Sequence, residues 1–298
     1  MFKQYIFFII IFQVSVYCHS QKIYVVDAVT KNSIPYANFS IMNKEQLQQG
    51  GYCSEKGALI INKNINFDHI MVSCIGYTNL DISKEMIQND TLLLKPAVYH
   101  LKEVLVKASK KIDRETLGYA NSKIKSLLSA IKGMEICTYI ENPYHEVKTI
   151  HSVLFKIRNP NKTKLGFRLH LYELDTIKKK PSKDLLDQNI IITIENKGKN
   201  VIEYDVSAYN LELPSNGAFI GIEWLGELND INNFVDAQQY ENGFIELNDK
   251  TDSFTTFQRN RFSIFPWTNM ERFKKNAENY QKYNNCPNAS FGISIYKE

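Results

Sequence analysis

The stretch GFRLHLY, residues 166–172, alternates apolar and polar residues in the pattern of a β-strand. Successive side chains of a strand point to opposite faces of its sheet, so the two kinds of residue separate. One face carries Phe167, Leu169 and Leu171. The other face carries Arg168, His170 and Tyr172. The apolar face suits a hydrophobic core, and three bulky polar or aromatic groups in a row on the opposite face can contact a ligand.

A second stretch of the same character, AFIGIEW at residues 218–224, is expected in the same sheet. Aromatic rings offer apolar faces to the C–H bonds of a sugar, and neighbouring polar side chains can hydrogen-bond its hydroxyl groups. The candidate ligand-binding residues are Arg168, His170, Tyr172, Glu223, Trp224 and Trp267. Trp224 also falls on an apolar stripe with Ile220 and Ile222, so ordinary core packing is the competing interpretation for it.

The chain begins with the pattern of a secretory signal peptide. Lys3 supplies a positive charge, residues 5–17 are largely apolar, and the small residues Cys18 and Ser20 precede the expected cleavage point. The apolar run is shorter than the roughly 20 residues of a membrane-spanning helix, and no other stretch is apolar enough to span. Tyr17 is too bulky for the position before a lipidated cysteine. We therefore expect plain export after removal of residues 1–20.

Length and composition limit the possible functions. The 298 residues are enough for two domains. A net charge of +4 is too mild to indicate nucleic-acid binding, which needs clustered positive charge. The sequence lacks a nucleophile elbow, a phosphate-binding glycine loop and a dinucleotide fingerprint. We therefore expect no cofactor, no metal and no enzymatic activity.

Four cysteines remain beyond the leader. They are Cys53, Cys74, Cys137 and Cys286. Export permits disulfides, and a bridge between Cys53 and Cys74 is one possibility. The alternative for Cys74, which lies in an apolar strand pattern, is a buried free thiol. No two cysteines have the close spacing of a zinc site.

Residues 21–107 predict a small β-sandwich, because short strand patterns alternate with turns. The expected strands are residues 23–28, 37–42, 58–62, 70–75, 91–95 and 103–107.

Several motifs of this region occur in a characteristic order. They are VVDAVT (25–30), IPYANFSI (34–41), YCSEKGALI (52–60), DHIMVSCIGY (68–77), LKP (94–96) and LKEVLV (101–106). Over about 85 residues they resemble the carboxypeptidase-regulatory-like domain of exported Bacteroidetes-type proteins. The resemblance implies a seven-strand, transthyretin-like sandwich in a periplasmic, outer-membrane-associated or extracellular protein. The chain departs from the pattern at Cys53, where the family usually has threonine.

The family name invites a zinc interpretation, because His100 and Glu103 have the local spacing of carboxypeptidase metal ligands. However, residues 101–106 also form the closing strand motif of the regulatory domain, which carries no metal. We favour a surface histidine beside a solvated glutamate.

Residues 108–114 form a polar, charged linker, and residues 115–298 predict a larger sandwich of the jelly-roll type. The expected strands are residues 115–119, 135–141, 150–157, 166–173, 188–195, 201–206, 218–224, 243–247 and 291–296. Residues 122–132 fit a helix or a strand. One inserted helix is expected at residues 269–283, because Thr268 and Glu271 form a capping-box pair before an apolar stripe.

The second region resembles exported proteins of the same bacterial group in which a sandwich of unassigned activity follows a regulatory-like domain. The motifs are LGFRLHLY (165–172), PSKDLL (181–186), NII (189–191), DVSAYN (205–210) and FIGIEW (219–224). We expect a non-enzymatic cell-envelope protein that binds a glycan or a protein partner. The rivals are a purely structural component and a glycan hydrolase, in which Glu223 pairs with Glu203 or Asp205. The loop at residues 229–233 is rich in oxygen ligands, but it lacks the features of an EF-hand and is interpreted as a turn.

Overall fold

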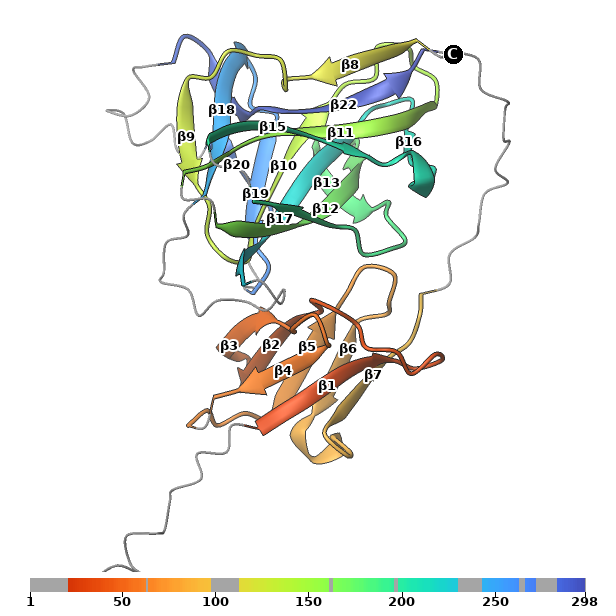
Figure 1. Ribbon diagram of the computed structural model, residues 1–298, viewed down its shortest axis with the longest axis vertical. Coiled ribbons are helices and arrows are strands. Elements are labelled where there is room, and N and C mark those ends of the chain that lie inside the picture. The colour runs from red at the N-terminus through yellow and green to blue at the C-terminus, as the bar shows by residue number, and fades with distance from the viewer. Residues whose placement is uncertain are drawn as a thin grey trace, which may run out of the picture.

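The computed structural model describes residues 21–62, 64–97, 113–160, 163–195, 198–229, 243–262, 266–271 and 283–297. The all-β class predicted from the sequence is confirmed, because the described elements are strands and two short 3-10 helices. Figure 1 shows the described residues as two bodies, the smaller one below the larger. We call residues 21–97 the first module and residues 113–297 the second module. The expected leader, the 103–107 strand, most of the 108–114 linker and His100 with Glu103 lie outside the described residues.

The first module consists of two sheets that share one core. The three-stranded sheet has the order β4 (Ala58–Ile61), β1 (Gln21–Asp27), β7 (Thr91–Leu94). The four-stranded sheet has the order β3 (Gln46–Tyr52), β2 (Asn38–Asn43), β5 (His69–Ser73), β6 (Leu80–Ser83). A short helix, η1 (Lys84–Met86), precedes β7. Apolar side chains that alternate along the strands, such as Ile23 and Val25 of β1, fill the space between the sheets.

The second module is built from a seven-stranded and an eight-stranded sheet. The first has the order β13 (Lys180–Asp184), β12 (Lys164–Asp175), β17 (Ala218–Leu228), β10 (Met134–Ile140), β19 (Thr256–Asn260), β20 (Thr268–Asn269), with β14 (Ile191–Ile194) also paired to β12. The second has the order β21 (Cys286–Ala289), β18 (Phe244–Thr251), β11 (Lys148–Asn159), β22 (Phe291–Tyr296), β8 (Arg114–Gly118). Beside that path, β15 (Gly198–Asp205) and β16 (Glu212–Leu213) pair with β11, and β9 (Ser126–Ser129) pairs with β18. The helix η2 (Ser207–Tyr209) follows β15.

The two ambiguous segments have different outcomes. Residues 122–132 contain the strand β9 and form no helix. At the start of the expected 269–283 helix, Thr268 lies in β20 and its hydroxyl donates to the Pro266 carbonyl, so it is not the helix cap that we expected. Residues 272–282 lie outside the described part of the chain.

The core of the second module lies between its two sheets. In β12, Phe167, Leu169 and Leu171 all belong to this core, as the alternation predicted. The opposite face of the seven-stranded sheet is turned toward the first module. There, Tyr36 and Tyr52 of the first module pack with Leu225 and Leu228 of β17.

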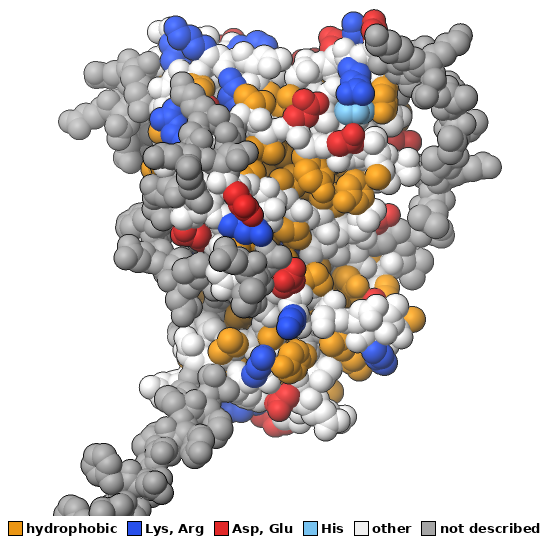
Figure 2. Space-filling view, in the orientation of Figure 1, with side chains coloured by type: hydrophobic (Ala, Val, Ile, Leu, Met, Phe, Trp, Pro, Cys, Tyr) orange, Lys and Arg blue, Asp and Glu red, His pale blue; other side chains and the backbone are white. Residues whose placement is uncertain are grey.

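Across the part of the chain that the structure describes, no helix is both long enough and apolar enough to cross a membrane. Figure 2 shows acidic and basic side chains interspersed over the visible face, without a large patch of one sign. This distribution agrees with the mild net charge of +4.

Candidate functional site

A row of four charged side chains crosses the seven-stranded sheet on the face turned toward the first module. The strand registers place Arg168 of β12 opposite Glu223 of β17, Glu223 opposite Glu135 of β10, and Glu135 opposite Arg259 of β19. Both glutamates are completely buried. Each has its own arginine at close range, since Arg168 Nη1 lies 2.7 Å from Glu223 Oε2 and Arg259 Nε lies 2.7 Å from Glu135 Oε2.

Two further cations lie between the glutamates. Like charges directly opposite each other on a sheet repel, so neighbouring carboxylates need compensation. His170 Nε2 is 3.1 Å from Glu223 Oε2 and 3.9 Å from Glu135 Oε1. Arg261 Nε is 3.7 Å from an oxygen of each glutamate. We call these groups, namely Glu135, Glu223, Arg168, His170, Arg259 and Arg261, the paired-glutamate network.

The register also explains why His170 reaches both carboxylates. The residue opposite His170 on β17 is Gly221, which has no side chain to fill the space between the strands on this face. A Cβ atom at Gly221 would lie only 2.6 Å from the Cys137 Cβ atom. The glycine therefore allows the close fit of β17 against β10 beneath the imidazole ring.

The network is joined to the first module by direct hydrogen bonds. The Tyr52 hydroxyl donates to Glu223 Oε1 at 2.7 Å, and Arg168 Nη2 donates to the Tyr36 carbonyl. Asn189 completes the link, because its Oδ1 accepts from Arg168 Nε at 2.7 Å and its Nδ2 donates to the Pro35 carbonyl at 3.1 Å. Arg168 is thus shared between a carboxylate of one module and the backbone of the other.

The electrostatics keep both glutamates ionised. Burial alone would raise the pKa of Glu223, but Arg168, His170 and Arg261 outweigh it and hold this pKa well below its ordinary value. The charges of His170, Arg259 and Arg261 likewise lower the pKa of Glu135, against the effect of burial. Neither carboxyl group is thereby suited to donate a proton near neutral pH.

His170 is held in its charged form by the same arrangement. Burial alone would lower its pKa, but the charges of Glu135 and Asp184 outweigh that effect and raise the pKa to about 9. The Nδ1 atom lies 2.5 Å from Asp184 Oδ2. The ring also stacks on Tyr172, with centroids 5.3 Å apart.

Tyr172 and Trp267 border the network at the Arg259 side. The Tyr172 hydroxyl donates to Glu135 and accepts from Arg259 Nη2 at 3.2 Å. Trp267 packs edge-on against the Tyr172 ring, and the Arg259 guanidinium carbon lies 4.2 Å from a Trp267 ring centroid. This distance is typical of a cation–π contact.

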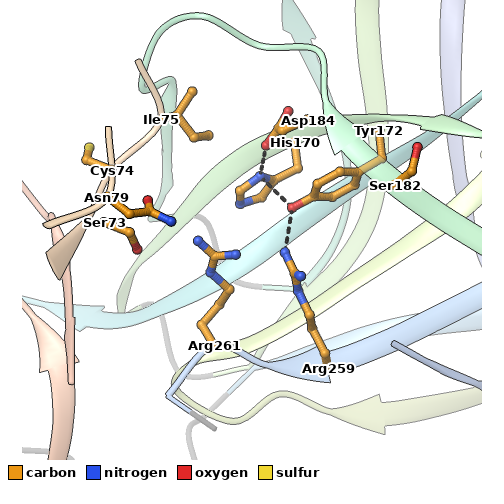
Figure 3. Close-up of a pocket in the computed structure, with 10 residues that line it drawn as sticks. All are labelled: Ser73, Cys74, Ile75, Asn79, His170, Tyr172, Ser182, Asp184, Arg259 and Arg261. Atoms are coloured by element: carbon orange, nitrogen blue, oxygen red, sulfur yellow. Dashed lines mark hydrogen bonds and ion pairs between the residues drawn. The ribbon is translucent and has the colours of Figure 1, made fainter. Parts of the chain in front are cut away.

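A pocket of about 230 Å³ opens beside the network, between the two modules. We call it the junction pocket. Its walls are Ser73, Cys74, Ile75 and Asn79 from the first module and His170, Tyr172, Ser182, Asp184, Arg259 and Arg261 from the second. Figure 3 shows these side chains around the pocket, with the Arg261 guanidinium reaching toward the middle of the group. The pocket is therefore lined mainly by hydrogen-bonding and charged groups.

The structure brings four of the six predicted site residues into contact. They are Arg168, His170, Tyr172 and Glu223. Trp267 lies at their edge. However, Arg168, His170 and Tyr172 are only 1%, 1% and 2% exposed, because the first module covers this face of the sheet. Of these three side chains, which were expected to contact a ligand, only His170 and Tyr172 reach the junction pocket, and Arg168 does not line it.

Trp224 is not part of the site. It is completely buried in the core of the second module, edge-on to Phe167 at a centroid distance of 4.7 Å. The competing interpretation, an ordinary core residue, is confirmed by this packing. Its neighbour Glu223 points to the opposite face, as strand alternation requires.

Sequence reasoning missed four residues of the site, namely Glu135, Arg259, Arg261 and Tyr52. The only available signal was the alternation of Phe257, Arg259 and Arg261, which places two arginines on the face that carries Phe257. When the neighbouring strand is unknown, the same alternation is equally typical of a solvent-exposed edge strand.

The proposed glycosidase carboxylate pair does not form. Glu203 and Asp205 belong to β15, which pairs with β11 in the eight-stranded sheet, whereas Glu223 lies in the seven-stranded sheet. Glu203 instead accepts a hydrogen bond of 2.7 Å from Ser152.

The other candidate sites are the 229–233 loop, a metal site and the cysteines. Most of the 229–233 loop lies outside the described residues. Elsewhere in the described ranges, no three His, Cys, Asp or Glu side chains are grouped so that they could hold a metal ion. Cys53, Cys74 and Cys137 are buried free thiols, so the Cys53–Cys74 bridge does not form. The Cys286 sulfur donates to the Asp252 carbonyl at 2.9 Å.

Comparisons with known proteins add no identification. No family model matches the sequence, and a search of curated proteins finds no significant match. The site geometry and the sequence motifs therefore have to support any functional assignment.

Proposed function

We propose that the chain is an exported, non-catalytic binding protein of the cell envelope, and that it binds a glycan at the junction pocket. The observation that carries the proposal is the pocket itself, whose polar walls come from both modules. Ligand sites occur preferentially at domain interfaces, where a few polar groups fix the orientation of the ligand. Export rests on the signal-peptide pattern of residues 1–20 and on the motifs that resemble a carboxypeptidase-regulatory-like domain.

The pocket offers the partners that sugar hydroxyl groups need. Ser73 and Asn79 face it from the first module, and Ser182 and Asp184 face it from the second. Hydroxyl and amide side chains both donate and accept hydrogen bonds, as sugar hydroxyl groups do. Tyr172 adds an aromatic ring to this wall, and aromatic rings suit the apolar face of a pyranose.

A hydrolase is the less favoured alternative, because Glu135 and Glu223 both serve as ion-pair partners of arginines. A purely structural role has one specific observation in its favour, the near-complete burial of the Arg168–Glu223 pair between the modules. A purely structural role depends on the buried ion pair alone. A glycan-binding role depends on the exposed wall of the pocket as well.

The test is glycan binding by residues 21–298 on an array of neutral and acidic oligosaccharides. We expect binding to at least one glycan, and a loss of at least tenfold in affinity for the Asn79→Ala/Ser182→Ala double variant. Both residues are exposed wall residues, so their truncation leaves the core intact. Asn285→Ala is the matched control, since Asn285 is exposed and does not line the pocket. Absence of binding to every glycan would leave the structural role.

A further inference from the structure

We infer that the junction pocket recognises the carboxylate of an acidic sugar, a uronic acid, through the Arg261 guanidinium. This inference rests on the proposed function and narrows it to one class of ligand. Its basis is that Arg261, unlike Arg168 and Arg259, makes no close contact with a glutamate.

The guanidinium groups of Arg168 and Arg259 each form a close ion pair with a glutamate. Both make contacts of 2.7 Å with a carboxylate oxygen, and Arg259 makes a second bond to Glu135 at 3.2 Å. Arg261 instead stands 3.7 Å from both glutamates, and its buried Nε has no hydrogen-bond partner. A guanidinium carries five N–H donors in a rigid fork that matches a carboxylate, so Arg261 retains the capacity for such a bond.

Arg261 is also placed so that a ligand can reach it. Its backbone N–H donates to the Gly133 carbonyl at 2.8 Å, which fixes the chain directly after β19. The side chain is 23% exposed, and it lines the junction pocket. In Figure 3 its guanidinium lies between Asn79 of the first module and the His170–Tyr172 wall of the second.

The charges around the pocket favour one added negative charge. The paired-glutamate network and Asp184 together contain four cations, namely Arg168, Arg259, Arg261 and charged His170, against the three carboxylates of Glu135, Glu223 and Asp184. One positive charge is left over within this group. Opposite charges attract more strongly in a partly buried site than in water, so a single carboxylate can balance the excess.

The position of Asp184 argues for a carboxylate over a more highly charged anion. Asp184 lines the same pocket and is 21% exposed, so a doubly charged phosphate would meet repulsion there. The neutral wall residues Ser73, Asn79 and Ser182 would remain for the hydroxyl groups of a sugar ring. The volume of about 230 Å³ lies below the roughly 300–1,000 Å³ of sites for drug-sized ligands, which suits one sugar unit.

The test is calorimetric titration of residues 21–298 with four ligands: galacturonate, its methyl ester, galactose and inorganic phosphate. We expect galacturonate to bind at least 30-fold more tightly than its methyl ester, which keeps the ring and loses the charge. Arg261→Gln should weaken galacturonate binding at least 30-fold. The exposed Arg114→Gln is the matched control and should bind galacturonate with unchanged affinity.

The comparison of galacturonate with its ester needs no variant, so it remains decisive even if Arg261→Gln fails to fold. Equal binding of the acid and its ester would overturn the inference, and so would equal binding by phosphate. Binding of neutral glycans alone on the array would overturn the inference and leave the proposed function in place. Absence of binding to every glycan and every titrated ligand would overturn both.

Discussion

At the scale of single residues, the paired-glutamate network turns an unfavourable arrangement into a stable one. Two buried carboxylates face each other across β17 and β10, and each carries a desolvation cost of several kcal/mol. The cations that flank them offset that cost only while all of them stay charged. His170 is the one cation of this set whose charge can be removed at moderately alkaline pH, because its pKa is raised only to about 9.

This property predicts a loss of stability on the alkaline side. The pKa of His170 rises from an ordinary value of 6.5 to about 9 in the folded protein. The stabilisation is therefore fully present below pH 6.5, and it is lost as the pH rises through 9. We expect the free energy of unfolding, measured in urea, to fall by roughly 3 kcal/mol across this window.

His170→Gln should remove most of this pH dependence, and His69→Gln, at a partly exposed histidine of the first module, should retain it. A wild-type protein whose unfolding free energy stays constant from pH 6.5 to 9.5 would contradict the assignment of a charged His170.

At the scale of elements, the spacing of β10, β17 and β12 depends on Gly221. A Cβ atom at this position would lie 2.6 Å from the Cys137 Cβ atom and 2.8 Å from the Ile136 carbonyl oxygen. A backbone atom cannot move aside as the end of a side chain can, so β10 and β17 would have to separate. The register that opposes Glu135 and Glu223 would be disturbed with them.

We therefore expect Gly221→Ala to lower the free energy of unfolding by about 1–3 kcal/mol, in the range of overpacked cores. Gly166→Ala, on the neighbouring strand β12, is the matched control. Its added Cβ atom would approach mainly the end of the Leu228 side chain, at 2.9 Å, which can shift. Chemical denaturation of both variants provides the comparison, and an equal loss for the two glycines would show that Gly221 has no special role.

Sequence patterns predicted the strands with strong apolar alternation and missed the short polar ones. β12 and β17 were expected, because their apolar residues alternate or run continuously. β19, with the sequence TFQRN, was missed, since only its Phe257 packs against other rings and the remaining residues resemble a loop. Arg259 of this strand and Arg261 directly after it are each only 23% exposed. Their partial burial could not be recognised, because the first module that lies beside them ends more than 150 positions earlier in the chain.

The same reasoning explains why the sequence pattern predicted only some of the site residues. Arg168, His170 and Tyr172 were selected because they alternate with core residues, and they do share a face. What covers that face is not encoded locally. Tyr52 and Tyr36 supply the cover, and the expected strands for the first module did not include β3, which carries Tyr52.

At the scale of the whole molecule, Arg168 is the main polar link between the modules. It pairs with Glu223 and donates to the Tyr36 carbonyl, and its side chain is 1% exposed. The apolar part of the junction is small, with Tyr36, Tyr52, Leu225 and Leu228 at its centre. Interfaces between domains that are small and polar permit relative motion unless such links hold them.

Arg168→Met should therefore uncouple the modules. In differential scanning calorimetry we expect one unfolding transition for the unaltered protein and two for this variant. We also expect a destabilisation of about 3 kcal/mol from the loss of one partner of a buried ion pair. The exposed Arg114→Met is the control and should leave a single transition. A single transition for Arg168→Met at an unchanged temperature would show that the apolar contacts alone join the modules.

The divided wall of the junction pocket has a practical consequence for work with shortened proteins. Ser73 and Asn79 come from the first module, and Ser182, Asp184 and Arg261 come from the second. Neither half expressed alone would contain a complete wall, even if it folded perfectly. A ligand screen of separated fragments would thus test two incomplete walls in place of the pocket.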